Sequence, residues 1–529
     1  MPDAVVIGAG PNGLVAANVL VDAGWSVEVL EAQPEPGGAV RSDRGVHPDY
    51  VSDLFSAFYP LAAASPVLAR LDLTAEGLRW SHAPRVLAHP LLDGRCAVLE
   101  RRVGETAAGL GSFAPADGDA WRDMYEVWSR VGPDLVRALF TPFPPVCAGL
   151  RLAARLGAAD GLRLARNLAL PVRRLGEEEF TGEGGRLLLA GNALHADLAP
   201  ESAGSGGFGW LMSMLGQSHG FPVPVGGAGA LTAALVNRLR RRGGVLRCGE
   251  RVTSVVVRGG RAVGVRTAGG DAVGARRAVL ADTSAPALYR ELVGEEHLPP
   301  RLLRDLERFH WDFATFKVDW ALTAPVPWTA PRAAGAGTVH VADGVDGLTR
   351  FASQVAMGLV PDEPFALFGQ MTTADPSRSP AGTESAWAYT HVPQRITSDA
   401  GSDGITGRWD AREQEAMADR MEAQVERFAP GFRALVRARR ILAPTTLQAM
   451  DENLHNGAIN NGTTALHQQA IFRPTPGTGR PETPVKGLYL ASAAAHPGGG
   501  VHGAPGANAA RAALRARGLH TLLHRPRRV

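Results

Sequence analysis

Three glycines near the start of the chain have the spacing that lets a backbone approach a diphosphate. Gly8, Gly10 and Gly13 follow a short apolar run, Ala4–Ile7, and lead into an apolar segment with helical periodicity. In a strand–loop–helix unit the first glycine permits the tight turn, the second lets the backbone approach a pyrophosphate, and the third lets the helix pack on the strand. Free N–H groups at the start of the helix then face the phosphates. The stretch therefore predicts a dinucleotide site, with contacts from Gly8, Gly10, Pro11, Asn12 and Gly13.

A carboxylate ends the second predicted strand of this unit. Gly24 closes the helix, residues 26–30 form a β-prone run, and Glu31 follows directly. A carboxylate in that place can accept hydrogen bonds from the hydroxyl groups of a ribose, and we assign Ala32 to the same site. No Arg or Lys follows at once to bind a ribose 2′-phosphate, which counts against NADP. A βαβ unit without a nucleotide is the alternative.

A second glycine pair, residues 37–38, is followed by an arginine, Arg41. At this distance from the first loop the pair resembles the GG motif of flavoproteins in the amine oxidase and phytoene desaturase superfamily. In those proteins the segment wraps the pyrophosphate and ribityl chain of FAD. The resemblance implies FAD, bound non-covalently, and it assigns Gly38, Ala39 and Arg41 to the cofactor. An ordinary Gly-Gly turn with a surface arginine is the alternative.

Residues 226–229 and the predicted elements that follow them, up to Ala281, resemble the second FAD-domain segment of the same superfamily. The sequence predicts a helix that ends at a glycine pair, a strand Val245–Cys248, a hairpin whose turn is Gly259-Gly260, and an apolar strand Ala278–Ala281. A two-residue Gly-Gly turn tolerates positive φ and is typical of a hairpin. In the superfamily, the backbone of the residue that matches Val252 binds the adenine side. On this resemblance Val252 and Ala281 are assigned to the cofactor site.

Near the C-terminus a strand runs into small residues, three glycines and an Ala-rich helix. Small residues let a backbone approach a flat ligand, and the start of the helix would supply N–H donors and a positive dipole end. Residues 496–503 are closely similar to the HPGxGVxG stretch of phytoene desaturases and carotenoid isomerases. Ser492 and Ala494 stand where that family has glycines. The predicted flavin contacts are Gly500, Val501 and His502.

All four motifs match one family in order, the phytoene desaturase and carotenoid isomerase-like group of FAD-dependent oxidoreductases. That group includes the pyridine nucleotide-disulfide oxidoreductase domain-containing protein 2 type. The resemblance implies an α/β fold with a Rossmann-like FAD-binding domain of the glutathione-reductase and amine-oxidase type, interleaved with a mixed α+β substrate domain. The expected FAD-binding pieces are 1–75, 205–285 and 475–529, and the expected substrate-domain pieces are 76–204 and 286–474.

Two polar residues on predicted substrate-domain strands are candidates for catalysis. Lys317 is one of only two lysines in the chain and lies inside an alternating, half-buried strand that also carries Asp319. An ammonium group shifts its pKa more readily than a guanidinium, and a lysine lies near flavin N5 in some amine oxidases. A Lys317–Asp319 surface pair is the preferred alternative. His391 shares one strand face with Trp387 and Tyr389, and it is either an acid or base or a structural histidine.

No paired carboxylates, Ser-His-Asp set or metal-ligand cluster stands out in the sequence, so we expect the flavin to carry the chemistry and no metal to be bound. The resemblance implies hydride transfer from a C–H bond of a small apolar, polyene- or isoprenoid-like molecule to flavin N5, as in desaturases and dehydrogenases. Oxygen or a quinone would reoxidise the flavin. An amine or amino-acid oxidase, a redox-neutral isomerase and a non-catalytic flavin-binding scaffold are the alternatives.

The composition is that of an ordinary globular chain. Of 529 residues 45% are hydrophobic and 20% charged, and the net charge of +3 is too small to indicate a nucleic-acid partner. Three cysteines without a close pair argue against a metal site and a secreted disulfide framework. No apolar run reaches the roughly 18–20 residues of a membrane span. The first motif begins so near Met1 that we expect no signal peptide, and a cytoplasmic protein.

Residues 133–175 are rich in arginine and have a calculated net charge of +5 from seven arginines and two aspartates. Leu152 and Leu156 share one helical face, and Arg151 and Arg155 another. Such a helix can lie on an anionic membrane surface as a peripheral contact. A solvated face over a substrate-domain core is the preferred alternative. Assembly into a homo-oligomer is left open.

Overall fold

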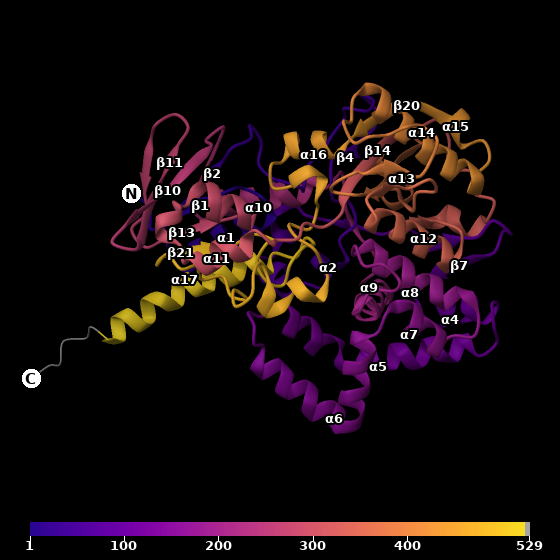
Figure 1. The fold of residues 1–529 in the computed structure, drawn as a ribbon, viewed down its shortest axis with the longest axis horizontal. Helices are drawn as coiled ribbons and strands as arrows, with labels where there is room; N and C mark the ends of the chain where they lie inside the picture. Colours follow the sequence, from indigo (N-terminus) through magenta and orange to yellow (C-terminus); the bar gives the residue numbers. More distant parts are fainter. Residues whose placement is uncertain (524–529) are drawn as a thin grey trace, which may run out of the picture.

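One of the two main sheets is parallel and carries the predicted dinucleotide motif. The computed structural model describes residues 1–523, and side chains to residue 516. The first strand runs into the glycine loop as predicted, and each neighbouring strand is parallel to it. Figure 1 shows this sheet with its helices in one half of the molecule. The spatial order of its strands is β21 (Leu488–Leu490), β13 (Ala278–Ala281), β1 (Ala4–Ile7), β2 (Val27–Glu31) and β9 (Val245–Cys248).

Three helices pack together on one face of this parallel sheet. The helix that follows the glycine loop lies between the other two. Apolar residues of these helices and of β1 and β2 form one continuous core. The helices are α1 (Pro11–Asp22), α10 (Gly229–Arg241) and α17 (Ala504–Leu523).

The opposite face of the parallel sheet is covered by a small antiparallel sheet. Its first two strands are the predicted hairpin, and the turn residues Gly259 and Gly260 have φ angles of 56° and 71°. Both turn residues therefore adopt the left-handed conformation that glycine allows without strain. The prediction of this hairpin is confirmed. The strands are β10 (Val252–Arg258), β11 (Arg261–Thr267) and β12 (Ala272–Gly274).

The second main sheet has seven strands and is mixed. All neighbouring pairs are antiparallel except one. Its spatial order is β20 (Val436–Leu442), β14 (Ala314–Leu322), β18 (Glu384–Val392), β17 (Ala366–Gln370), β15 (Ala336–Val341), β6 (Arg85–Pro90) and β7 (Cys96–Leu99).

Both faces of this mixed sheet are covered. Met417 and Met421 of α14 (Ala411–Phe428) pack with Phe316 and Trp320 of β14 on one side. Two helices, α8 (Glu183–His195) and α9 (Ser205–His219), pack on the other side, against β6 and β7. Every residue of β14 is consequently buried. The prediction of a half-buried strand is wrong, because alternation of residue type does not reveal a second covering layer.

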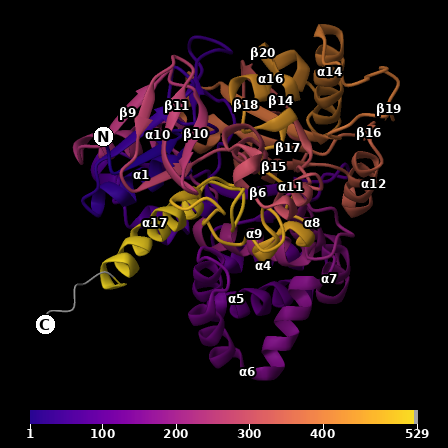
Figure 2. The same ribbon diagram turned by 60° about the vertical axis from the view of Figure 1, so that its left-hand side comes forward.

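A helical region completes the molecule below the two sheets in Figure 1. Its outermost member, α6 (Val146–Ala169), kinks at Gly157 and buries only Ala148. Figure 2 shows α6 at the far edge of the molecule, next to α5. No helix within residues 1–523 is long and apolar enough to cross a bilayer. The other helices of the region are α4 (Val103–Gly111), α5 (Asp117–Leu139) and α7 (Val172–Glu179).

The parallel sheet takes its strands from three separated parts of the chain, and the mixed sheet from two. Helix α9, which the expected boundary at residue 205 placed in an FAD-binding piece, packs on α6, α7 and α8 instead. The expected piece 475–529 also runs past the described residues, because 524–529 lie outside them. The remaining named strands and α-helices are β3 (Ser42–Asp43), β4 (Ser52–Asp53), α2 (Pro60–Ala63), α3 (Pro66–Ala69), β5 (Trp80–Ser81), β8 (Val223–Pro224), α11 (Pro300–Leu306), α12 (Gly344–Ala356), β16 (Leu359–Val360), α13 (Met371–Ala374), β19 (Ser398–Asp399), α15 (Phe432–Leu435) and α16 (Pro444–Met450).

A buried arginine links the two halves. The Arg378 guanidinium is fully buried and pairs with Asp53 at 3.0 Å and with Asp375 at 2.9 Å. Asp53 also accepts the Ala228 N–H beside α10. The three charged groups hold the loop that carries Arg378 against the half that contains the parallel sheet.

Candidate cofactor and substrate cavity

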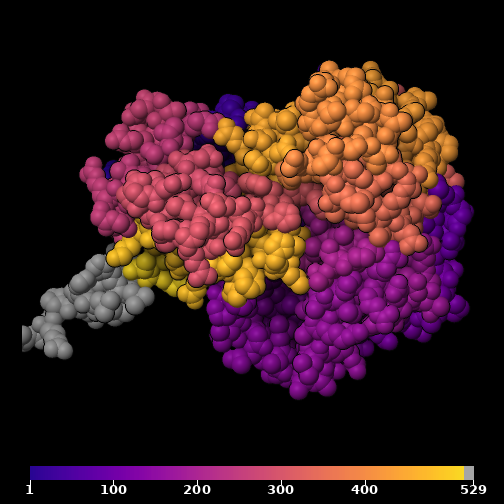
Figure 3. All heavy atoms as spheres, viewed as in Figure 1, coloured from indigo at the N-terminus to yellow at the C-terminus, as the bar shows by residue number. Residues whose placement is uncertain are grey.

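A cavity of about 880 Å³ lies between the two main sheets. One part of its wall comes from the glycine loop, the end of β2 and the residues after β13. The other part comes from β14, β18, α9 and the end of α5. Late segments of the chain, yellow in Figure 3, fill the surface between the two halves. Residues of these segments, between 447 and 502, also line the cavity.

The glycine loop has the close packing that a dinucleotide requires. A Cβ atom on Gly13 would lie 2.2 Å from the carbonyl oxygen of Gly8, so the strand and helix approach each other only because no side chain intervenes. Gly8, Gly10 and the two residues after it line the cavity, whereas Gly13 lies behind them. The side-chain Oδ1 of Asn12 is buried and has no hydrogen-bond partner among the described residues. An unpartnered acceptor beside this cradle fits a bound hydroxyl-bearing ligand.

Glu31 lies at the end of β2 as predicted and is held by the main chain. Its Oε2 accepts the Ala9 N–H at 2.6 Å and its Oε1 accepts the Gln33 N–H at 2.8 Å. Each carboxylate oxygen can accept a second hydrogen bond. Glu31 and Ala32 both line the cavity, so the remaining acceptor capacity is available to a ribose.

The segment of the second glycine pair lines the cavity, but the side chain of the arginine that follows it does not. Gly38 and Ala39 are part of the lining, and Arg41 is not. The Arg41 guanidinium donates to the carbonyl oxygens of Gly38 and Met450 and lies over the Phe55 ring. Arg41 therefore fixes the loop against α16.

Of the two residues assigned to the cofactor at the start of β10 and the end of β13, one lines the cavity and the other does not. Val252 lines the cavity, whereas Ala281 is fully buried inside the parallel sheet. The next residue, Asp282, is the one that lines the cavity. Sequence reasoning missed Asp282, although an acid directly after a parallel strand is the same signal that identified Glu31.

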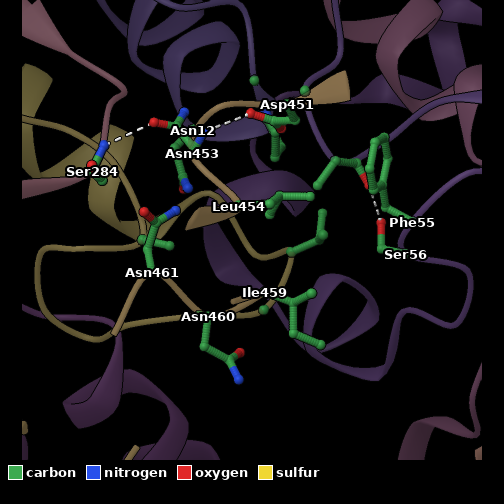
Figure 4. A pocket seen from close by; sticks show the side chains of 18 of the residues that line it. Asn12, Phe55, Ser56, Ser284, Asp451, Asn453, Leu454, Ile459, Asn460 and Asn461 are labelled. Carbon is green, nitrogen blue, oxygen red and sulfur yellow. Dashed lines mark hydrogen bonds between the residues drawn. The ribbon is translucent and has the colours of Figure 1, made fainter. Parts of the chain in front are cut away.

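Polar side chains from the 451–461 segment close the cavity beside the parallel sheet. Figure 4 shows Asn453 between Ser284 and Asp451. Asn453 Oδ1 accepts the Ser284 N–H at 2.8 Å, and Asp451 Oδ1 accepts the Asn453 N–H at 3.1 Å. These bonds connect the loop after β13 to the loop after α16. The sequence contained no motif for this segment.

Gly500, Val501 and His502, the predicted flavin contacts, line the cavity. Helix α17 starts at Ala504, two residues after His502. The Ala504 N–H is accepted by His502 Nδ1 at 3.1 Å, and the imidazole stacks on Phe140. Burial lowers the pKa of His502 to about 4, so its ring is neutral at neutral pH.

Lys317 is buried and lines the cavity. Its side chain is 2% exposed, its Nζ donates to the main-chain oxygen of Asp53 at 3.0 Å, and it pairs with Asp319. Arg440 also pairs with Asp319, at 2.7 Å. Burial lowers the pKa of Lys317, and its carboxylate partner only partly offsets that effect. The surface pair offered as the alternative is wrong, because the two residues pair inside the protein.

The structure does not bring His391 to the cavity. Trp387 and Tyr389 of the same strand face line it, and His391 lies behind Tyr389 with Nε2 2.8 Å from Asp197 Oδ1. Burial lowers the pKa of His391, but the Asp197 carboxylate more than offsets this, and the pKa is raised. The histidine that lines this part is His195, which the sequence did not single out.

The wall formed by α9, β18, the end of α5 and residues 58–61 is apolar and aromatic. Trp387 and Tyr389 stack there, with ring centroids 5.9 Å apart. No carboxylate belongs to this described part of the lining, and the ionisable groups next to it include His195, Lys317 and His502. The apolar and aromatic residues are Phe58, Tyr59, Pro60, Leu61, Leu139, Phe140, Phe208, Leu211, Met212, Trp387 and Tyr389.

Comparison with known proteins gives consistent matches over nearly the whole chain. Residues 12–514 match the family described as flavin containing amine oxidoreductase. The chain is 29% identical to pyridine nucleotide-disulfide oxidoreductase domain-containing protein 2 of Rattus norvegicus, over 97% of this chain and 93% of that protein. It is 26% identical to a lycopene-forming phytoene desaturase of Pseudescherichia vulneris, over 97% and 99% of the two chains.

Among solved structures, cyclohexylamine oxidase from Brevibacterium oxydans has the same fold. The TM-score is 0.59 at 17% identity, and the match covers 99% of this chain and all of that one. The predicted α/β fold, with a Rossmann-like domain interleaved with a mixed α+β domain, is confirmed.

Proposed function

The chain belongs to the family of flavin containing amine oxidoreductases, and on that premise we propose that it is an FAD-dependent desaturase or dehydrogenase of apolar, polyene- or isoprenoid-like molecules. When bound, FAD supplies the hydride acceptor, N5 of the flavin, for a C–H bond of the substrate. The substrate loses this hydride and a proton, and oxygen or a quinone is the final electron acceptor. The residues of the chain hold the cofactor, orient the substrate and exclude water.

The residues that line the cavity support separate places for the cofactor and the substrate. Glu31 and Asn12 offer acceptors to the hydroxyl groups of the cofactor, and Gly10 and Gly38 leave room for its phosphates. At the other part, the Trp387–Tyr389 stack presents flat apolar surface to a substrate. We propose that Lys317 holds a proton at Nζ beside this stack, 5.8 Å from the Trp387 ring centroid.

The observation that carries the substrate class is the position of the acids in the cavity lining. Residues 58–61, the end of α5, α9 and β18 contribute none of them, and the acids of the lining are Glu31, Asp282, Glu291, Asp451 and Glu452. A protonated amine would enter this wall without an anion to neutralise it and would lie near the buried Lys317. A buried charge without a partner is strongly unfavourable. A neutral apolar molecule meets no such cost and buries its surface against aromatic and aliphatic side chains.

Amine or amino-acid oxidation, redox-neutral isomerisation with reduced FAD, and a non-catalytic flavin-binding role are the competing functions. The family description and the fold of cyclohexylamine oxidase support the first of these. The cavity wall argues against it, for the electrostatic reason just given.

The test is anaerobic mixing of the FAD-loaded protein with detergent-solubilised linear polyenes and, separately, with primary amines. Loss of the visible absorbance of oxidised flavin with a polyene but not with an amine is expected. Leu211→Glu places a carboxylate in the apolar wall and should slow reduction by the polyene at least tenfold, because that charge must be desolvated. Leu92→Glu, at an exposed position, is the matched control. Reduction by amines alone would contradict the proposal.

A further inference from the structure

A buried carboxyl group lies where the predicted phosphate loop turns into α1. Asp282 directly follows β13, and its Oδ2 accepts the Gly13 N–H at 2.7 Å. The residue is 7% exposed and belongs to the cavity lining. In a sheet of this topology a dinucleotide crosses between the carboxyl ends of the two strands at which the strand order reverses, here β1 and β13. Asp282 therefore faces the path of the cofactor's phosphates.

A carboxylate lies close to each of the two glycines, Gly10 and Gly38, that leave room for those phosphates. A Cβ atom on Gly10 would lie 2.7 Å from Asp282 Oδ2, and a Cβ atom on Gly38 would lie 3.3 Å from Asp451 Oδ2. The charged groups that act on Asp282 are Asp451 and Glu31, and both are acids.

No cation pairs with Asp282 within the described part of the chain. Asp282 takes part in none of the ion pairs, and the two arginines of the surrounding loops are engaged elsewhere. Arg41 donates to two main-chain carbonyl oxygens, and Arg251 pairs with Glu452 at 2.5 Å.

This environment favours the neutral form of the carboxyl group. Burial and, to a smaller extent, the neighbouring acids Asp451 and Glu31 raise the pKa of Asp282 to about 8, in spite of the hydrogen bond from Gly13. Burial likewise raises the pKa of Asp451 to about 6. A pyrophosphate brings additional negative charge into the same space, where like charges repel strongly because little water screens them.

We infer that Asp282 binds FAD as a neutral carboxylic acid, which keeps the hydrogen bond from Gly13 and donates its O–H to a pyrophosphate oxygen. Where the free carboxyl group is ionised, FAD binding takes up one proton from the solvent. The inference rests on the proposed FAD site and adds a residue and a protonation state to it.

The sign of the pH dependence follows from linkage. Bound phosphate raises the pKa of Asp282 above its value of about 8 in the free protein. Below that pH the group is protonated in both states, and the FAD affinity does not change on its account. Above it, binding must take up a proton, so the Kd rises by up to about tenfold for each pH unit. If Asp451 were the group that took up the proton, the rise would begin near pH 6 instead.

The experiment measures the Kd of the apo-protein for FAD by fluorescence quenching between pH 5.5 and 9.5. The wild-type Kd should be flat up to about pH 8 and then rise, by at least fivefold at pH 9.5. Asp282→Asn keeps the shape, the acceptor for Gly13 and an N–H donor, and should remove the rise. Asp451→Asn should leave the rise in place. ADP-ribose, which like FAD carries the pyrophosphate as a diester without an ionisation between pH 5.5 and 9.5, should show the same pH dependence as FAD, and adenosine should show none.

Each alternative result overturns the inference in a distinguishable way. A pH-independent wild-type Kd, a rise that persists in Asp282→Asn, or a rise seen with adenosine would show that Asp282 is not the group. Failure of the wild-type protein to bind FAD at any pH would instead overturn the proposed function itself. Circular dichroism of both variants establishes that they are folded.

Discussion

The Lys317 ammonium group is held from two sides at the cavity wall. The main-chain oxygen of Asp53 and the carboxylate of Asp319 take two of its N–H groups, and Arg440 shares the carboxylate. The lowered pKa means that this lysine loses its proton more readily than a solvated lysine does. At this position Lys317 can hold a proton or a water molecule beside the substrate, and it also stabilises the strand through a buried pair.

Replacing Lys317 by methionine tests both roles. We expect FAD to stay bound, because Lys317 contacts none of the cofactor loops except through Asp53, and we expect flavin reduction or reoxidation to slow at least tenfold. Stability should fall by about 2 kcal/mol, less than for a fully uncompensated buried charge, because Arg440 still pairs with Asp319. Stopped-flow absorbance and urea unfolding measure the two effects.

The chain offers a matched control in its other lysine. Lys486 is exposed, and Lys486→Met should change neither the rates nor the stability beyond about 0.5 kcal/mol. Unchanged flavin kinetics in Lys317→Met, with FAD retained, would reduce Lys317 to a structural residue.

At the scale of elements, α6 is less basic in the fold than in the sequence. Arg166 and Arg174 pair with Glu178 of α7, which lies just outside the Arg-rich segment 133–175. Arg155 pairs with Asp134 of α5. The helix instead exposes apolar side chains, with Leu150 67% and Leu162 73% exposed. A peripheral membrane contact through α6, which we propose, would depend on these leucines more than on charge.

Liposome co-sedimentation tests that contact. We expect the wild-type protein to sediment with anionic vesicles and the double substitution Leu150→Asp and Leu162→Asp to reduce the bound fraction at least fivefold, because it removes the apolar surface that would insert. Met357→Asp, at an exposed apolar position on the C-terminal side of α12, should have no effect. Equal binding of all three proteins would exclude α6 as the contact.

At the scale of the whole molecule, the buried histidines make stability depend on pH. A histidine that stays neutral in the folded state but takes up a proton when unfolded destabilises the fold as the pH falls. Burial lowers the pKa of four histidines from 6.5 to about 4. Each of them therefore lowers the free energy of unfolding by about 3 kcal/mol at pH 4 relative to pH 7. These residues are His89, His195, His496 and His502.

We therefore expect these histidines to lower the free energy of unfolding between pH 6.5 and 4, while the raised pKa values of Asp282 and Asp451 act in the opposite direction. His89→Gln should flatten this dependence, because one neutral histidine is removed, and His297→Gln, at an exposed position, should not. His391 acts with the opposite sign: its raised pKa contributes stability below pH 6.5 that is lost as the pH rises through the folded-state value. Urea unfolding at several pH values measures the slope, and equal slopes for wild type and His89→Gln would contradict the assignment.

The sequence was sufficient to predict the features that depend only on residues close together along the chain. The βαβ unit, the Gly259-Gly260 hairpin and the carboxylate at the end of β2 follow from glycine conformations and from apolar periods of a few residues. The cavity wall contributed by Gly8, Glu31 and Gly500 could therefore be predicted.

The tertiary structure alone decided which side chains meet. Lys317 contacts a residue 264 positions away, and the Gly13 N–H is bound by a carboxylate 269 positions away. Whether a strand is covered on one face or two, whether His391 or His195 reaches the cavity, and whether Arg378 is exposed depend on such contacts. No period within a strand or helix encodes them, because burial is set by the elements that pack around a residue. The parallel sheet and its cofactor loop were thus determined by the sequence, and the charges and walls of the cavity by the fold.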